Sequence, residues 1–224
     1  MRLGILFSGG KDSNYVLYRA KKEGHEVPVL INVVSGEDSY LFHTINYNIV
    51  DLQAKALDIP LERIYTNVER EYEDLIDALR NIKEKYSLEG IGFGVIKSRY
   101  QYKKFSKIFE EMNLYSFTPL WMRDEEEYLY ELINMGFKVI ISGFFAYPFD
   151  KSLLGKELDE KIVKYLKELN EKYKINMAGE GGEIETTVLY QPYFGKKIVI
   201  DKYKEIIGNN YGIFKIEEAH LEDI

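Results

Sequence analysis

The chain has 224 residues, of which 46% are hydrophobic and 30% charged, and its formal net charge is −7 at pH 7. This length suits one large domain, or a medium domain with a smaller one, and no apolar run approaches the ~18 residues of a membrane span. An acidic chain lacks the excess of positive charge that nonspecific nucleic-acid binding requires. Because the chain has no cysteine, it cannot form disulfides, cysteine-bound iron–sulfur clusters, cysteine persulfides or a cysteine glutaminase site.

The first informative segment lies between an apolar run at residues 3–7 and a helical pattern at residues 14–22. Its sequence is Ser8-Gly9-Gly10-Lys11-Asp12-Ser13. A strand, a glycine turn and a helix N-terminus together predict an anion site, because unpaired backbone N–H groups and the helix dipole favour negative charge there. The two glycines allow close backbone approach, and Ser8, Ser13 and Lys11 add donors. We interpret the segment as a phosphate cradle; the alternative is an ordinary tight turn.

Spacing decides which cradle this is. A Walker loop needs four residues between its glycines and then Lys-Ser/Thr, whereas five residues separate Gly4 from Gly10, and Asp12 stands where the magnesium-binding hydroxyl belongs. The segment instead resembles the PP-loop, Ser-Gly-Gly-x-Asp-Ser, of the N-type ATP pyrophosphatases. This resemblance implies that ATP is cleaved between its α- and β-phosphates, that AMP is transferred to a substrate oxygen, and that the loop holds pyrophosphate.

Strand and helix patterns alternate along the first half of the chain. Apolar runs predict strands at 27–34, 63–66, 90–95 and 115–118, and helical stripes predict a helix capped by Thr44 and another at 69–85. Such alternation predicts a parallel sheet covered on both faces. Ligands of these sheets bind at the carboxyl ends of the strands, where the glycine loop lies.

The pattern changes after residue 123. We predict helices at 125–135 and 157–173, a strand at 138–142, and short β-like runs at 186–190, 197–200 and 213–216, broken by Pro192, Gly195, Gly208 and Gly212. The predicted fold is therefore α/β, and the PP-loop resemblance implies a nucleotide-binding domain of the adenine-nucleotide α-hydrolase type at 1–123. A smaller α+β domain, expected to bind substrate, occupies 124–224.

A second chemical segment lies in the C-terminal part, Gly179-Glu180-Gly181-Gly182-Glu183-Ile184-Glu185-Thr186-Thr187. Its glycines permit unusual backbone angles and close ligand approach. Its three carboxylates are suited to binding magnesium, or to acting as general bases toward ammonium or an amine. The alternative is a flexible acidic turn.

A basic cluster is formed by Lys97, Arg99, Lys103, Lys104 and Lys107. It suits a clamp on phosphate or on an acidic partner, and equally the solvated face of a helix.

The PP-loop combined with the acidic segment resembles the diphthine–ammonia ligase family. The similarity extends to Ser39–Thr44, Gly94–Gln101, Pro119–Trp121 and Leu153–Gly155, and the family's usual residues are replaced at Tyr102, Ser106 and Ile184. The resemblance implies that the carboxylate of diphthine, a modified histidine on translation elongation factor 2, attacks the α-phosphate of ATP. Ammonia then displaces AMP to give the amide, diphthamide.

The resemblance also implies roles for individual residues. The residues expected to bind ATP are Ser8, Gly9, Gly10, Lys11, Asp12, Ser13 and Ser98, and Asp12 is expected to bind Mg²⁺ as well. The residues expected to take part in catalysis are Lys11, Asp12, Glu183 and Glu185. The residues expected to bind substrate or ammonia are His43, Lys97, Tyr100, Gln101, Glu180, Gly181, Gly182 and Glu183.

Other interpretations are another PP-loop enzyme with a different substrate (such as a lysidine-type tRNA ligase), a nucleotide sensor that does not hydrolyse ATP, and a non-catalytic subunit of an amidase. The chain begins Met1-Arg2-Leu3, directly before the first predicted strand. We therefore expect no signal or transit peptide and a cytoplasmic protein that does not contact a membrane.

Overall fold

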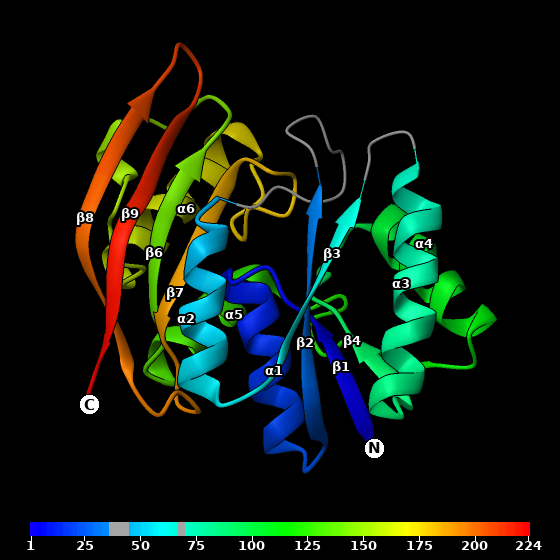
Figure 1. Cartoon of the computed structure of the whole chain (residues 1–224). Helices are drawn as coiled ribbons and strands as arrows, with labels where there is room; N and C mark the ends of the chain where they lie inside the picture. Colours follow the sequence, from blue (N-terminus) through cyan, green and yellow to red (C-terminus); the bar gives the residue numbers. More distant parts are fainter. Residues whose placement is uncertain (36–44, 67–69) are drawn as a thin grey trace.

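The structure is a computed structural model that describes residues 1–35, 45–66 and 70–224. Its framework consists of two sheets (Figure 1). The first is parallel, with strand order β3-β2-β1-β4-β5. Its strands are β1 (Arg2–Leu6), β2 (Glu26–Ser35), β3 (Leu61–Thr66), β4 (Gly90–Gly92) and β5 (Tyr115–Phe117).

Helices cover both faces of this parallel sheet. They are α1 (Lys11–Lys22), α2 (Tyr47–Leu57), α3 (Glu71–Tyr86) and α4 (Arg99–Glu111). Alternate residues of β2 enter two separate hydrophobic cores, Leu30 on the side of α1 and α2, and Val29 and Ile31 on the side of α3 and α4. This period of two is the expected pattern for a strand buried on both faces, and the α/β prediction is confirmed.

The second sheet is antiparallel, with strand order β7-β6-β9-β8. It contains β6 (Lys138–Phe144), β7 (Ile184–Tyr190), β8 (Lys197–Ile207) and β9 (Gly212–Glu222), accompanied by α5 (Glu125–Asn134), a 3-10 turn η2 (Lys151–Leu153) and α6 (Glu160–Tyr173). In Figure 1, α1 and α2 lie between the two sheets.

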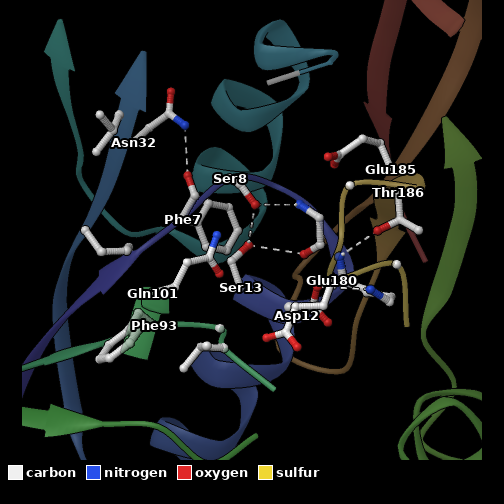
Figure 2. A pocket seen from close by; sticks show the side chains of 18 of the residues that line it. Phe7, Ser8, Asp12, Ser13, Asn32, Phe93, Gln101, Glu180, Glu185 and Thr186 are labelled. Carbon is white, nitrogen blue, oxygen red and sulfur yellow. Dashed lines mark hydrogen bonds and ion pairs between the residues drawn. The ribbon is translucent and has the colours of Figure 1, made fainter. Parts of the chain in front are cut away.

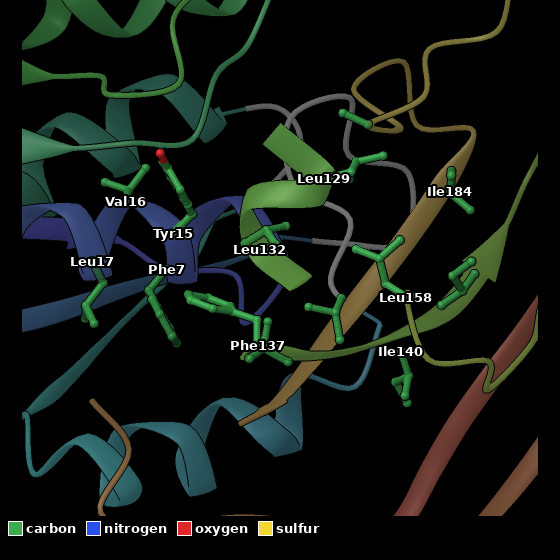
Figure 3. Packing of buried hydrophobic residues seen from close by; sticks show 14 of the residues in the cluster. Phe7, Tyr15, Val16, Leu17, Leu129, Leu132, Phe137, Ile140, Leu158 and Ile184 are labelled. Atoms are coloured by element: carbon green, nitrogen blue, oxygen red, sulfur yellow. The ribbon is translucent and has the colours of Figure 1, made fainter. Parts of the chain in front are cut away.

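One hydrophobic core joins the two sheets. It contains Phe7 and Leu17 from the first part of the chain and Leu132, Ile140 and Ile184 from the second (Figure 3). Because α1 is buried between the sheets, the loop that precedes it faces both halves of the molecule. We propose residues 1–123 and 124–224 as two domains, with the boundary where the chain passes from one sheet to the other.

Several elements differ from their predicted bounds. β8 and β9 are eleven residues each, much longer than predicted, because residues 208–211 form the turn of a hairpin and Gly212 is the first residue of β9, so neither glycine breaks a strand. Helix α6 starts at Glu160 rather than 157, since the Asp159 side chain accepts a hydrogen bond from Ile162 N and caps the helix there.

Helix α1 starts three residues earlier than predicted, at Lys11, so Lys11, Asp12 and Ser13 belong to its first turn. Helix α2 begins at Tyr47 after Asn46, and the expected cap Thr44 lies outside the described residues. Across residues 1–35, 45–66 and 70–224, no helix combines the length and apolar character that crossing a bilayer requires.

Candidate active site

A cavity of about 460 Å³ opens at the carboxyl ends of β1, β2 and β4. Its walls come from four places: the end of β1 and the loop after it, residues 31–33 of β2, residues 93–95 after β4, and residues 179–186 before and within β7 (Figure 2). Gln101 and Phe105 of α4 complete it. The sheet order reverses beside β1, and such switch points are where open α/β sheets bind ligands.

The Ser-Gly-Gly segment forms a tight turn into α1. Gly9 has φ +84°, a left-handed conformation, and a Cβ there would lie 2.7 Å from Gln53 Oε1. Ser13 Oγ donates to the Gly10 carbonyl at 3.1 Å and lies 3.3 Å from Ser8 Oγ. Gly10 at the N-cap of α1 has no side chain to cap the helix, and the Lys11 N–H donates to Thr186 Oγ1 of β7. The first turn carries further backbone N–H groups, which suit phosphate oxygens.

The Asp12 carboxylate is held from two directions. Oδ2 accepts a hydrogen bond from Lys11 Nζ at 3.0 Å, and Oδ1 accepts one from the Tyr128 hydroxyl at 2.9 Å. Tyr128 is completely buried, and burial, followed by the Asp12 charge, raises the pKa of its phenol well above the usual value. The phenol therefore keeps its proton and acts as a donor to Asp12.

Lys11 is only 4% exposed, and its ammonium also donates to the carbonyl of Ala178 at 2.5 Å. It thus ties the start of α1 to the chain just before the acidic segment. Its backbone N–H donates to Thr186 Oγ1 at 3.2 Å, and Val188 N donates to the Gly9 carbonyl at 3.1 Å. Two motifs about 170 residues apart in the chain therefore form one site.

Glu180 lines the cavity and fixes the segment that leads into α4. Its Oε1 accepts a hydrogen bond from Ile96 N at 2.5 Å, and its Oε2 accepts one from Lys97 N at 2.6 Å. Both carboxylate oxygens are thus engaged by backbone N–H groups. The neighbouring Gly179 has φ +72° and lies close to the Ile184 backbone, so a side chain would not fit there.

Glu185 lines the cavity and directly precedes Thr186, which contacts the start of α1 (Figure 2). Burial raises the pKa of its carboxyl to about 7; the charge of Lys11 lowers this pKa and the charge of Asp12 raises it. A carboxyl with this pKa exchanges its proton near neutral pH, as a general acid or base requires.

The remaining predicted site residues occupy different positions. Gln101, Gly181 and Gly182 line the cavity together with Ser8, Gly10, Lys11, Asp12, Ser13, Glu180 and Glu185. Gly9, Lys97, Ser98, Tyr100 and Glu183 are not among its lining residues, and His43, like the whole matched segment 39–44, lies outside the described residues. One carboxylate oxygen of Glu183 is buried without a described hydrogen-bond partner.

Ser98 caps α4 by accepting a hydrogen bond from Gln101 N at 3.4 Å. Tyr100 is 69% exposed on the outer surface. Lys97 donates from Nζ to Glu125 Oε1 at 2.8 Å, and Glu125 Oε2 accepts from Met177 N at 2.7 Å. The basic cluster that begins with Lys97 is therefore partly neutralised by α5.

Three residues that shape the site were not predicted from the sequence. Tyr128 reaches Asp12 from α5, Thr186 reaches the start of α1 from β7, and Asn32 lines the cavity from β2. Asn32 has a weak sequence signal, because it is the one polar residue within the apolar run 27–34. Tyr128 has none, since its position depends on packing between distant helices.

Within the described part of the chain, no group of three or more His, Asp or Glu side chains is placed to hold a metal ion. Asp12 offers a carboxylate at the edge of the phosphate loop, its side chain 31% exposed. This fits a magnesium ion that is bound mainly by the phosphates of a nucleotide, because Mg²⁺ commonly takes only one or two carboxylates from the protein.

The fold is a parallel α/β sheet with a glycine turn at the carboxyl end of its first strand, and this turn leads into a helix N-terminus, an arrangement suited to binding phosphate. Comparison with known proteins gives the family. Residues 1–116 match the diphthamide synthase N-terminal domain, and residues 124–221 match the diphthamide synthase C-terminal domain. The chain belongs to the diphthine–ammonia ligase family.

Individual members of this family align with nearly the full length of the chain. The diphthine–ammonia ligase of Rattus norvegicus is 38% identical over 250 residues, and that of Homo sapiens is 35% identical over 250 residues; each alignment covers 100% of this chain and 93% of the relative. The Schizosaccharomyces pombe relative of the same name is 31% identical over 95% of this chain and 38% of its own length.

Among solved structures, a U34-tRNA thiolase from Methanococcus maripaludis aligns with a TM-score of 0.41 and 13% identity, covering 82% of this chain and 70% of that chain. A likeness at this level assigns neither substrate nor activity.

Proposed function

We propose that this chain is an ATP-dependent amide ligase that activates the carboxylate of diphthine on translation elongation factor 2 and converts it into an amide with ammonia. The observation that carries the proposal is the meeting of the phosphate loop with the acidic segment around one cavity. We propose the cytoplasm as its location, because its protein substrate acts in translation there.

The first half of the reaction needs a bound and polarised triphosphate. The first turn of α1, with Ser8 and Ser13 beside it, is suited to the β- and γ-phosphates. Asp12 would hold Mg²⁺, which when bound offsets the negative charge that develops on the leaving phosphates. The substrate carboxylate oxygen then bonds to the α-phosphorus, the bond to the β-phosphate oxygen breaks, and pyrophosphate leaves.

The second half needs neutral ammonia and a place for its protons. Glu185, with a pKa of about 7, accepts a proton from ammonium or from the attacking nitrogen. The nitrogen bonds to the acyl carbon, the acyl carbon–oxygen bond breaks, and AMP leaves with the oxygen that came from the substrate. Lys11 and Glu180 serve this step by position, because they hold the acidic segment against α1 and against residues 96–97.

The test is amidation of elongation factor 2 that bears diphthine, with purified protein, ATP, Mg²⁺ and ammonium. We expect amide on the factor, detected by mass spectrometry, with one AMP per amide and no AMP when the factor is omitted. Asp12→Asn should abolish the reaction. Asp77→Asn is the matched control, because Asp77 lies on the exposed surface of α3 and pairs only with Arg80 among the described residues. Failure of the wild-type protein to form amide at saturating ATP would contradict the proposed substrate.

A further inference from the structure

Glu125 is a buried carboxylate beside the site that the reaction steps above do not use. It lies in the first turn of α5 and is 8% exposed, whereas Glu126 is partly exposed and Glu127 is exposed. A carboxylate in the first turn of a helix is favourable without being buried. Removing it from water is costly unless it is paired and hydrogen-bonded. The burial of Glu125 therefore needs a reason beyond the stability of α5.

The two oxygens of Glu125 hold two separate segments of the chain. Oε1 accepts a hydrogen bond from Lys97 Nζ at 2.8 Å, and Oε2 accepts one from Met177 N at 2.7 Å. Lys97 lies just before α4, and Met177 lies two residues before Gly179, where the acidic segment begins. Glu125 thus joins α5 to both of these segments.

The same two segments also bind each other directly. Glu180 of the acidic segment accepts hydrogen bonds from the backbone N–H groups of Ile96 and Lys97. Lys97 is therefore held at its backbone by the acidic segment and at its side chain by α5. Neither Glu125 nor Lys97 is among the described residues that line the cavity, so each acts on the site through other groups.

The contacts of Glu125 lead into the phosphate loop. Glu125 holds the residue that precedes Ala178, and the Ala178 carbonyl accepts a hydrogen bond from Lys11 Nζ, which also donates to Asp12. Tyr128, three residues after Glu125 on α5, donates to the other oxygen of Asp12. Because residues three apart are neighbours on a helix surface, one face of α5 contacts both motifs of the site.

We propose that Glu125 is a positioning residue for the ligase reaction, holding the acidic segment against the phosphate loop and against the start of α4. The inference rests on the proposed function, because the segment that Glu125 holds carries Glu180 and Glu185. Lys97, for which the sequence predicted substrate binding, would serve the same positioning role.

Hydrogen exchange reports the placement of these segments without turnover. Glu125→Ala removes both acceptors. We expect the backbone amides of Ile96, Lys97 and Met177 to exchange roughly 10- to 100-fold faster in the folded variant than in wild type, as loss of a hydrogen bond to a charged group predicts.

Glu126→Ala is the matched control on the same helix. Glu126 pairs with Lys167 of α6 at 2.9 Å, and the Lys97 and Lys167 side chains are each 46% exposed, but the Glu126 pair lies away from both motifs. This control should keep the wild-type exchange of the three amides and the wild-type kinetics.

Amide formation with elongation factor 2 that bears diphthine separates positioning from stability. We expect Glu125→Ala to lower kcat by roughly 10- to 100-fold, the cost of slightly displaced groups, with KM for ATP and for the factor within about threefold of wild type. Glu125→Gln keeps an acceptor for Met177 N and loses the pair with Lys97, so its kcat should lie between those of Glu125→Ala and wild type.

Wild-type exchange of the three amides in Glu125→Ala would overturn the inference, and so would faster exchange with a wild-type kcat. If Glu125→Ala does not fold, Lys97→Met decides, because it breaks the same link from its exposed side. Faster exchange with a lower kcat in Lys97→Met supports the inference, whereas a raised KM for the factor alone would make Lys97 a substrate contact and overturn it. A wild-type protein that forms no amide contradicts the proposed function and this role together.

Discussion

Glu185 is the proposed base of the amide-forming step, and its electrostatic surroundings set the pH at which its carboxyl can accept a proton. Burial raises the pKa of its carboxyl to about 7, so a proton that would leave in water at lower pH stays bound until near neutrality. The neighbouring Lys11 limits this increase and Asp12 adds to it. A base of this strength is useful here because ammonium must lose a proton before the nitrogen can attack.

We expect Glu185→Gln to lower the rate of amide formation by roughly 10²- to 10⁴-fold, the usual range for loss of a general base. The rate of the wild-type protein should rise as pH increases through about 7, and the residual rate of the variant should lack this step. The measurement is amide formation across pH 5.5–8.5 at saturating ATP. An unchanged pH profile in the variant would exclude Glu185 as the base.

The same substitution tests the electrostatics without turnover. Between the ordinary carboxyl pKa of 4.5 and about 7, folded protein holds a proton on Glu185 that unfolded protein has released, so wild-type stability falls as pH rises through that window. Glutamine does not titrate. We therefore expect the free energy of unfolding of Glu185→Gln, relative to that of wild type, to increase by about 1–3 kcal/mol as the pH rises from 4.5 to 8. The measurement is urea unfolding at several pH values, and a difference between the two proteins that stays constant with pH would contradict the raised pKa.

Gly9 is needed both for its left-handed backbone and for the space where a side chain would lie. An added Cβ would lie 2.7 Å from Gln53 Oε1 and 3.0 Å from Val50 Cγ2, whereas at Gly24, with a similar φ of +79°, it would meet no described atom within 4 Å. We expect Gly9→Ala to cost about 2–4 kcal/mol of unfolding free energy and Gly24→Ala about 1 kcal/mol. Equal costs in urea unfolding would show that the packing at Gly9 is loose.

At the scale of elements, the start of α1 is positioned by α5 as well as by its own strand. The Tyr128 hydroxyl bonds Asp12, and the Tyr128 ring meets the Tyr15 ring edge-on at 5.1 Å. Removing this hydroxyl leaves the packing in place and frees one oxygen of the proposed metal ligand. The contact is therefore a means of orienting Asp12 toward the bound nucleotide.

We expect Tyr128→Phe to raise the Mg²⁺ concentration needed for half-maximal ATP binding by about 3- to 10-fold, corresponding to loss of one hydrogen bond to a charged group. The measurement is a Mg²⁺ titration of ATP binding. Tyr130→Phe, a partly buried position on the same helix, is the control and should behave as wild type. Identical titrations for both variants would show that Tyr128 only fills space.

The elements that could be predicted are those with local signals. The turn at Gly9 and Gly10 and the alternation of strands and helices are encoded within short windows, and they gave the parallel sheet and the position of the phosphate loop. The lengths of β8 and β9 were not predictable from Gly208 and Gly212, because a glycine can end a strand or turn a hairpin. The position of Tyr128 depends on tertiary packing, which has no local pattern. Thr186 lies within the predicted acidic segment, but its contact with Lys11 N depends on the packing of β7 against α1.

At the scale of the whole molecule, the two sheets depend on a small set of buried polar contacts as well as on their shared core. Gln53 of α2 is fully buried and donates from Nε2 to the carbonyls of Gly9, at 2.9 Å, and Val188, at 2.7 Å. It thus joins the phosphate loop of the first half to β7 of the second. This arrangement predicts that the halves unfold together.

We expect Gln53→Leu to lower the unfolding free energy by about 2–4 kcal/mol, because the Val188 carbonyl loses the Gln53 donor and the Gly9 carbonyl keeps only Val188 N among the described donors. The single Trp121 stacks on Tyr102 with ring centroids 4.1 Å apart and so reports on the first half, while hydrogen exchange of β6 and β9 reports on the second. Coincident urea transitions by both probes are expected for wild type. Two separate transitions would show that the halves fold independently.

The central claim is that the substrate carboxylate attacks the α-phosphorus of ATP at the loop before α1. Labelling the diphthine carboxylate with ¹⁸O and analysing the products by mass spectrometry tests this claim most directly. We expect one labelled oxygen in AMP for each amide formed, with unlabelled pyrophosphate. Label in orthophosphate together with formation of ADP, or amide formed with unlabelled AMP, would contradict the account.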